Sequence, residues 1–372
     1  MNNVENRRVT GRHLIWGNIM SRPLRSTLSM VAISLQVFLI LLIVGLTSGV
    51  LADWGERAEG VGADILVQPP NSSIFFAFSS AVMQQSVAQQ LAGIPSVDEV
   101  APVLTVVNSA NLNVVYGIDE QSFEGLSNGF KFLAGHALEH SDDALADDLA
   151  AQAGRLHIGD TITLINRPFH LRGIVLHGKG ARFFIPLKTA QDIAGADKRI
   201  SMLYVRSKGD TEAARAAVVK LLPNYKVRSM AEYTTLMTSS NLPELKPFIR
   251  SFVLLGAGIS FLVVLLTMHT MVMERTREIG VLKSIGSTRF GIVKLIEAEA
   301  SLLAVLGSVL GIAVTFSTAY LLRHLSPTLQ IRIGADWVAK SVALALVASA
   351  VGALYPAIRA AQSDPIEALA YE

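Results

Sequence analysis

The sequence predicts a membrane α-helical protein with four transmembrane helices, in a 1+3 arrangement around a large α+β extracytoplasmic domain. The chain contains four uncharged apolar segments: Ser26–Ala52, Ser251–Met273, Ala300–Leu322 and Ser341–Ile358. Each is long enough, or nearly so, to cross about 30 Å of hydrocarbon as a helix. Residues 53–250 are mostly polar and separate the first segment from the other three. The insertion therefore lies between the first and second helices.

Composition agrees with four spans plus one soluble domain. The 372 residues have a mean hydropathy of +0.43, with 51% hydrophobic and 17% charged residues. The formal net charge of +2 gives no reason to expect a nucleic-acid partner. The absence of cysteine excludes a disulfide framework, a thiol nucleophile and a Cys-based zinc site. The first apolar segment is about twice as long as a signal-peptide core, so we expect it to be retained as a span.

The distribution of basic residues predicts the orientation. Residues 1–25 carry five arginines and one acid, and the short loop between the second and third spans carries five basic residues. The positive-inside rule places both segments in the cytoplasm. With four spans, both termini are then inside and the large domain is outside. Residues before Pro23 have the spacing of an amphipathic surface helix, and a disordered basic tail is the alternative.

These observations predict nine segments along the chain. They are a cytoplasmic amphipathic helix (1–25), a first span (26–52), an extracytoplasmic α+β domain (53–250), a second span (251–273), a cytoplasmic helix or loop (274–294), a third span (295–322), a short external loop (323–340), a fourth span (341–358) and a cytoplasmic tail (359–372).

Alternation and turn residues predict the elements of the inserted domain, with a division into two lobes near residues 119–140. The expected strands are Ala63–Gln68, Val103–Val107, Asn113–Ile118, Thr161–Ile165, His170–Leu176, Arg182–Pro186, Met202–Arg206 and Tyr225–Arg228. The expected helices are Ala81–Leu91, Asp142–Ala153, Leu187–Ala194 and Thr211–Leu221.

An apolar run in the inserted domain is a candidate contact for a hydrophobic substrate or for the outer leaflet. It consists of Ile74, Phe75, Phe76 and Phe78, and ordinary domain core is the alternative. His136 and His140 have the spacing of metal ligands. They lie beside Asp142 and Asp143 but lack a third well-placed His or a Glu-containing motif, so no metal site is expected.

The chain lacks the motifs of common catalytic sites. It has no G-x-x-x-x-G-K-[ST] loop for ATP, no G-x-S-x-G and no H-E-x-x-H. We therefore expect a non-catalytic subunit rather than an enzyme. The most informative stretch is Glu274–Arg289, which alternates charged and apolar residues at helical spacing. A short helix of this kind suits docking in a groove of a partner, and a solvated loop is the alternative.

Several motifs resemble the FtsX/MacB-type permeases of ABC transporters, a group that includes MacB, LolC, LolE and DevC. The most specific are "ERTREIGVLKSIGST" from Glu274 and "YPAIRAAQSDPIEALAYE" from Tyr355. "GADILVQ" after the first span and "LHIGDTITL…FHLRGIVL" in the domain are also similar. The resemblance covers essentially the whole chain, although MacB carries a fused ATPase and this chain does not.

The resemblance implies a permease in a bacterial inner membrane that works as a dimer with two copies of a separate cytoplasmic ATPase. The ATPase would bind ATP and Mg, and this chain would need no cofactor of its own. ATP-driven closure would move the external domains to extrude or extract a hydrophobic or amphiphilic substrate, a mode called mechanotransmission. Lipids and a periplasmic adaptor or lipoprotein are further expected partners. The implied ATPase-docking residues are Glu278, Ile279, Gly280, Leu282, Lys283 and Gly286.

Small residues in the spans are candidates for close helix packing, either between two copies or within one bundle. They are Gly45 and Gly49, Gly256 and Ser260, and Gly307 and Gly311, and Gln36 is expected to find a polar partner across a dimer axis. A homodimer is the favoured assembly, with a heterodimer as the alternative.

Two other functions are compatible with the same architecture. One is an FtsX-like regulator whose external domain activates a cell-wall hydrolase. The other is a haem exporter that uses His269 between Met268 and Met271.

Overall fold

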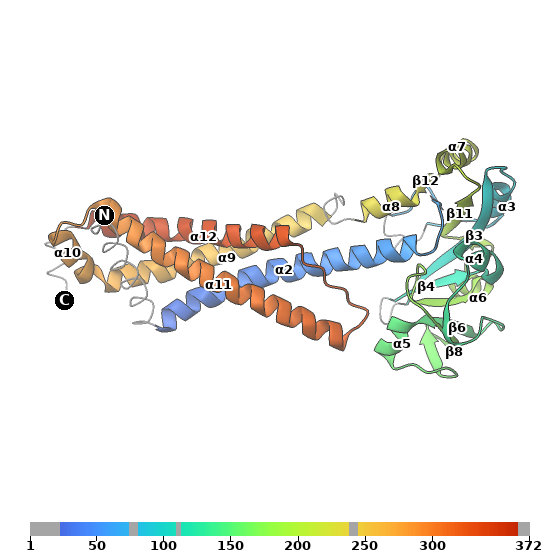
Figure 1. The fold of residues 1–372 in the computed structure, drawn as a ribbon, viewed down its shortest axis with the longest axis horizontal. Helices are drawn as coiled ribbons and strands as arrows, with labels where there is room; N and C mark the ends of the chain where they lie inside the picture. Colours follow the sequence, from blue (N-terminus) through green and yellow to red (C-terminus); the bar gives the residue numbers. More distant parts are fainter. Residues whose placement is uncertain (1–22, 74–80, 109–112, 238–244, 364–372) are drawn as a thin grey trace, which may run out of the picture. The chain divides into compact units, whose positions relative to one another are not determined.

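A computed structural model describes residues 23–73, 81–108, 113–237 and 245–363 (Figure 1). The described chain folds as two compact units. Residues 23–48, 245–321 and 331–363 form a helical unit, and residues 49–237 with 322–330 form an α+β external domain.

Four long helices make up the predicted spans. They are α2 (Pro23–Glu59), α9 (Leu245–Glu274), α11 (Arg289–Leu325) and α12 (Ala335–Gln362), and within the described residues these four are long and apolar enough to cross a membrane. The predicted fold class is thereby confirmed. Each helix extends beyond its uncharged segment, because charge marks the limit of the hydrocarbon and not the end of a helix. A short helix, α10 (Thr276–Ser284), lies between α9 and α11.

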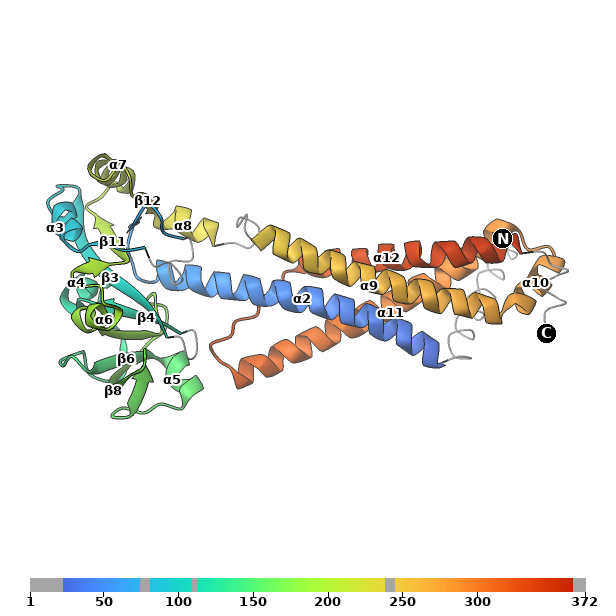
Figure 2. The same cartoon turned by 180° about the vertical axis from the view of Figure 1, so that it is seen from behind.

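The helical unit is held together by close contacts between small residues and apolar side chains. Helices α9 and α12 lie side by side in both views (Figures 1 and 2). A Cβ atom placed on Gly352 of α12 would lie 3.0 Å from the Phe261 carbonyl oxygen of α9. On the α2 side, Ser29 Oγ donates a hydrogen bond of 2.7 Å to Thr267 Oγ1 of α9. Hydroxyl groups inside an apolar bundle need such partners.

The external domain is built on one mixed sheet of ten strands among the described residues. The order is β12-β1-β11-β3-β4-β9-β6-β8-β5, with β7 paired to β8, and β2 and β10 form a separate ribbon. The β4–β9 and β6–β8 pairs are parallel, and the other pairs are antiparallel. The strands are β1 (Ile65–Gln68), β2 (Met83–Gln84), β3 (Val97–Asn108), β4 (Asn113–Ile118), β5 (Phe132–Gly135), β6 (Asp143–Asp147), β7 (Thr161–Leu164), β8 (Arg167–Val175), β9 (Phe183–Pro186), β10 (Arg199–Ile200), β11 (Met202–Ser207) and β12 (Lys226–Ser229).

Short helices pack on this sheet and close its core. They are α3 (Ser86–Ala92), α4 (Glu120–Ser127), α5 (Asp148–Gly154), α6 (Leu187–Ala194), α7 (Thr211–Leu221) and α8 (Met230–Leu236). Val67, Leu104 and Ile185 are among the buried core residues. Helix α6 approaches β4 so closely that a Cβ atom on Gly117 would lie 2.2 Å from the Ala190 Cβ atom. A residue without a side chain is therefore required at position 117.

The helix predicted over Asp142–Ala153 is wrong in its first half. Residues 143–147 form the fully buried strand β6, which pairs with β8 and β9. The Asp147 side chain then accepts a 2.6 Å hydrogen bond from the Ala150 backbone N–H, so the helix begins only at Asp148. Tertiary pairing overrides the helix propensity of this Ala-rich stretch. The helix predicted over Ala81–Leu91 is likewise shortened, because Met83–Gln84 pair with β10.

The predicted division near residues 119–140 does not separate two sheets. Strand β4 precedes this region and pairs directly with β9, which follows it. Hydrogen bonding is therefore continuous from β12 to β5.

Candidate functional site

The short helix α10 is the candidate site in the helical unit. Its inward face carries Ile279, which is 8% exposed and belongs to an apolar cluster that also contains residues of α2, α9, α11 and α12. Gly280 is buried beside it, and Leu282 packs at the edge of the same cluster. The helix thus packs its apolar side against the bundle through an amphipathic pattern of period 3.6.

A buried ion pair holds the start of α10 to α11. Arg275 Nη1 lies 3.4 Å from Glu299 Oε1, and the two residues are 8% and 3% exposed. The more exposed Glu278 carboxylate lies 3.8 Å from Arg275 Nε. A buried charge is tolerated only when an opposite charge compensates for its lost hydration. Glu299 therefore fixes the position of Arg275 and of the helix that follows it.

A second attachment holds the end of α10 to α12. Lys283 Nζ donates hydrogen bonds to the carbonyl oxygens of Ala361, at 2.9 Å, and of Ser363. These carbonyls lie at the C-terminal end of α12, where the helix dipole attracts a cation.

Gly286 ends α10 with a left-handed turn. Its φ is +100°, and its N–H donates to the Lys283 carbonyl while the Ser287 N–H donates to the Leu282 carbonyl. This Schellman pattern favours glycine. The turn leaves Ile285 80% exposed, and Phe290 is 75% exposed in the first turn of α11. Val281 is also exposed, at 43%, and we call these three apolar residues the α10 face.

The predicted docking residues divide between the two sides of α10. Glu278 and Gly286 are exposed, Leu282 and Lys283 are half-buried, and Ile279 and Gly280 face the bundle. Their docking role stays a prediction. The predicted set lacks Val281, Ile285 and Phe290, because the exposed side of an amphipathic helix is known only once the helices packed against it are known. Glu299 is also missing from that set, although a carboxylate inside the predicted third span (295–322) signals a functional position.

The small residues predicted for helix packing have partners within the same chain. A Cβ atom on Gly307 would lie 2.9 Å from Ile33 Cβ, and one on Gly311 would lie 2.6 Å from the Ser34 carbonyl oxygen. One on Gly45 would lie 2.8 Å from Ile333 Cγ1. These three positions therefore bring α2 against α11 and against the segment before α12.

Of the four remaining packing candidates, Gly256 is half-buried and the other three are buried. Gly49 is buried, and Ser260 is fully buried on α9. Gln36 is 3% exposed and faces α9, where a Cβ atom on Gly256 would lie 3.4 Å from its Cγ atom. Neither polar atom of Gln36 has a hydrogen-bond partner within the described chain.

The predicted substrate contact, Ile74, Phe75, Phe76 and Phe78, lies outside the described residues, as does the amphipathic segment before residue 23. His269 is described. Its Nε2 atom lies 3.3 Å from Arg359 Nη1. Its ring is stacked on that of Tyr355, with 6.4 Å between the two ring centroids. Within the described residues, no group of three or more His, Asp or Glu side chains could hold a metal ion.

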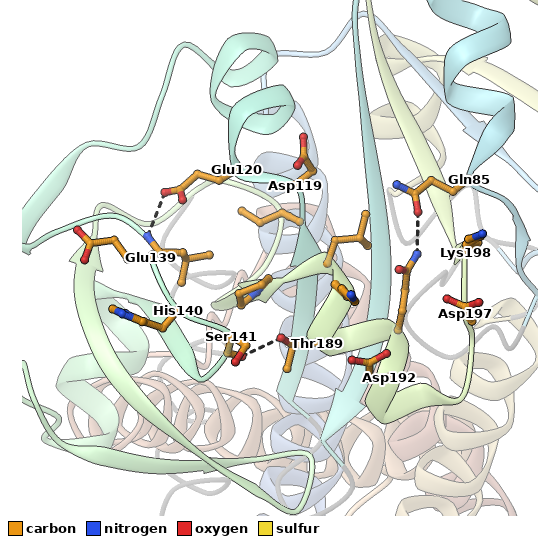
Figure 3. Close-up of a pocket in the computed structure, with 16 residues that line it drawn as sticks. Gln85, Asp119, Glu120, Glu139, His140, Ser141, Thr189, Asp192, Asp197 and Lys198 are labelled. Carbon is orange, nitrogen blue, oxygen red and sulfur yellow. Dashed lines mark hydrogen bonds between the residues drawn. The ribbon is translucent and has the colours of Figure 1, made fainter.

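A cavity of about 770 Å³ lies in the external domain between α6 and residues 138–141 (Figure 3). Thr189 Oγ1 donates to the Ser141 carbonyl at 2.7 Å, and the Leu138 N–H donates to Glu120 Oε1 at 3.1 Å. Partial burial raises the pKa of Glu120, and the Leu138 N–H opposes that rise. The charged lining residues are Asp119, Glu120, Glu139, Asp192, Asp197, Lys188 and Lys198, so acids outnumber lysines.

Comparisons with known proteins agree with this architecture. Residues 26–221 match the family model of the MacB-like periplasmic core domain, and residues 250–365 match that of the FtsX-like permease C-terminal region. The uncharacterized ABC transporter permease YknZ of Bacillus subtilis (strain 168) is 22% identical over 95% of this chain and 97% of its own length. The macrolide export ATP-binding/permease protein MacB of Sodalis glossinidius is 25% identical over 97% of this chain. This chain spans 60% of the length of that MacB protein.

Solved structures of external domains are also similar. The crystal structure of the periplasmic region of MacB from Actinobacillus actinomycetemcomitans is 20% identical, with a TM-score of 0.37 over 46% of this chain and 92% of its own. The first family model alone covers more than half of the chain. The chain therefore belongs to the FtsX/MacB-type permeases of ABC transporters.

Proposed function

We propose that this chain is the membrane subunit that transmits ATP-driven motion from a separate ATPase to the external domains. Two ATPase copies bind and hydrolyse ATP with Mg, and two copies of this chain form the membrane part, with both termini in the cytoplasm. The chain itself catalyses no reaction. The substrate, which is hydrophobic or amphiphilic, is extruded or extracted by the external domains and does not pass through the bundle.

The observation that carries this proposal is the attachment of α10. Arg275–Glu299 ties its start to α11, and Lys283 ties its end to α12. The α10 face stays exposed between these attachments. A short helix that is fixed to several spans and exposes an apolar face suits binding in a groove of a partner. Force applied to this helix reaches α11 through Glu299 and α12 through Lys283, and the apolar cluster that contains Ile279 extends to α2 and α9.

The docking experiment uses the full chain, purified in lipid nanodiscs from its native host. Co-purified proteins and lipids are identified by mass spectrometry, and ATPase activity is measured in the same sample. Ile285→Asp removes an exposed apolar contact from the α10 face without touching the buried cluster. Leu133→Asp is the matched control, because Leu133 is 52% exposed on β5 in the external domain.

We expect the ATPase to co-purify with the wild type and with Leu133→Asp, and to be lost with Ile285→Asp. Retention of the ATPase by Ile285→Asp would refute the docking surface. Recovery of an external cell-wall hydrolase in place of an ATPase would instead favour an FtsX-like regulator.

A further inference from the structure

Four charged side chains form a buried network inside the external domain. Asp53 and Arg57 belong to the C-terminal part of α2, Asp147 ends β6, and Arg182 immediately precedes β9. They are 8%, 6%, 1% and 7% exposed, respectively. Two positive and two negative charges balance, which is the condition under which charges are tolerated away from water.

Arg182 is at the centre of this network. Its Nη1 atom lies 3.0 Å from Asp147 Oδ2, and its Nη2 atom lies 3.1 Å from Asp53 Oδ2. Asp53 is also held by Arg57, whose Nε atom lies 3.0 Å from Asp53 Oδ2. Arg57 Nη1 donates to the Gly180 carbonyl oxygen at 3.1 Å. The planar guanidinium of Arg182 thereby joins the sheet to α2.

The same guanidinium reaches the segment between α11 and α12. Arg182 Nη2 donates to the Thr328 carbonyl oxygen at 3.2 Å, and Gln330 Nε2 donates to Asp53 Oδ1 at 3.3 Å. Thr328 is 146 positions from Arg182 in the sequence. Residues 322–330 pack with the external domain as part of the same unit.

We propose that Arg182 fastens the α11–α12 segment to the external domain and to α2, so that these three parts move together. Arg182 is a positioning residue, because it acts through Asp53 and Thr328. The proposal deepens the proposed function and rests on it: displacement of α2 is carried to the segment that leads into α12.

The chemistry of the link explains its stiffness. Hydrogen bonds from a charged donor are stronger than those between neutral groups, and they gain further strength away from water. Detaching the Thr328 carbonyl would remove one of the bonds that compensate for the burial of Arg182. Separation of the α11–α12 segment from α2 therefore costs free energy, because it weakens the compensation of every charge in the network.

A charge-balanced double variant isolates the link. Arg182→Met alone would leave Asp147 buried without its counter-charge and risks misfolding. Arg182→Met combined with Asp147→Asn removes one charge of each sign and leaves the Asp53–Arg57 pair. Asn is also a good N-cap, so α5 keeps its first turn. Arg167→Met, at an exposed position on β8, is the control for loss of an arginine.

The assay measures the distance between spin labels on the full chain in nanodiscs. The sequence has no cysteine, so Glu59→Cys and Leu325→Cys provide the only thiols. Both positions are exposed and lie in the external unit, at the ends of α2 and α11. We expect the distance between the two labels to have a single narrow distribution in the otherwise wild-type chain and in Arg167→Met. In the double variant this distribution should broaden. Arg182→Lys, which keeps the charge, should restore part of it.

An unchanged narrow distribution in the double variant would overturn the proposal. The measurement on the chain alone needs no ATPase, so its outcome is independent of docking. In the assembled complex, which holds two copies of this chain, ATP should shift the distances between the labels of one copy and those of the other, and leave the distance within each copy unchanged. Absence of any shift there, with the link intact in the chain alone, would refute the proposed function and leave Arg182 as a fastening residue.

Discussion

Replacement of Glu299 by Gln tests whether the buried ion pair positions α10. Gln keeps the size of the side chain but removes the counter-charge that lies 3.4 Å from Arg275 Nη1. Both residues are almost fully buried. Removing one partner of a buried pair costs about 3–5 kcal/mol, and we take about 3 kcal/mol because Gln retains an acceptor oxygen.

The expected loss of affinity follows from how far the broken ion pair shifts the equilibrium between attached and displaced α10. Each 1.4 kcal/mol changes an equilibrium constant tenfold. A cost of about 3 kcal/mol therefore lowers the affinity for the ATPase by at most on the order of a hundredfold. The assay titrates the ATPase that co-purifies with the wild type onto labelled chain in nanodiscs. Thermal unfolding of the same samples reports whether the bundle is intact.

The control variant removes the charges of both Arg275 and Glu299. Arg275→Met combined with Glu299→Leu leaves no uncompensated charge, and such replacements are often neutral or stabilising. We expect this double variant to bind the ATPase far better than Glu299→Gln. Wild-type affinity in Glu299→Gln, or equal loss in both variants, would refute the argument from charge compensation.

Three further predictions concern other contacts. Lys283→Met removes two charge-assisted hydrogen bonds to the end of α12, each worth about 1.5–3 kcal/mol, and should increase hydrogen exchange in α10 but not in α7. Gly311→Ala should lower the unfolding temperature of the bundle, since overpacking costs about 1–3 kcal/mol, whereas Gly258→Ala, with no atom within 4 Å of the new Cβ, should not. Burial alone would raise the pKa of Asp143, but the backbone N–H groups of Glu139 and His140 lower it below its ordinary value. Its contribution to stability is therefore present above about pH 4 and is lost as pH falls through the lowered pKa, so Asp143→Asn should destabilise the external domain at pH 7, and the difference from the wild type should shrink as pH falls below about 4.

Local patterns in the sequence identified most of the elements. The strand Asn113–Ile118 and the helices Leu187–Ala194 and Thr211–Leu221 have the predicted bounds. The alternating residues, capping residues and turn residues that predict an element lie within it or a few positions from it, so a single sequence is enough to identify the element. Strand β6 was missed because its Ala-rich sequence favours a helix, and only pairing with β8 and β9 makes it a strand.

The sequence by itself determined that this protein has four apolar spans, an inserted α+β domain and a charged amphipathic helix between the second and third spans. Tertiary structure decided which side of that helix is exposed, and it decided that Gly307 and Gly311 contact α2 of the same chain. It also brought Arg182 to Asp53 and Thr328, which are 129 and 146 positions away. Periodicity is a local property of a chain, whereas the partner of a buried charge is set by packing between segments that are distant in sequence.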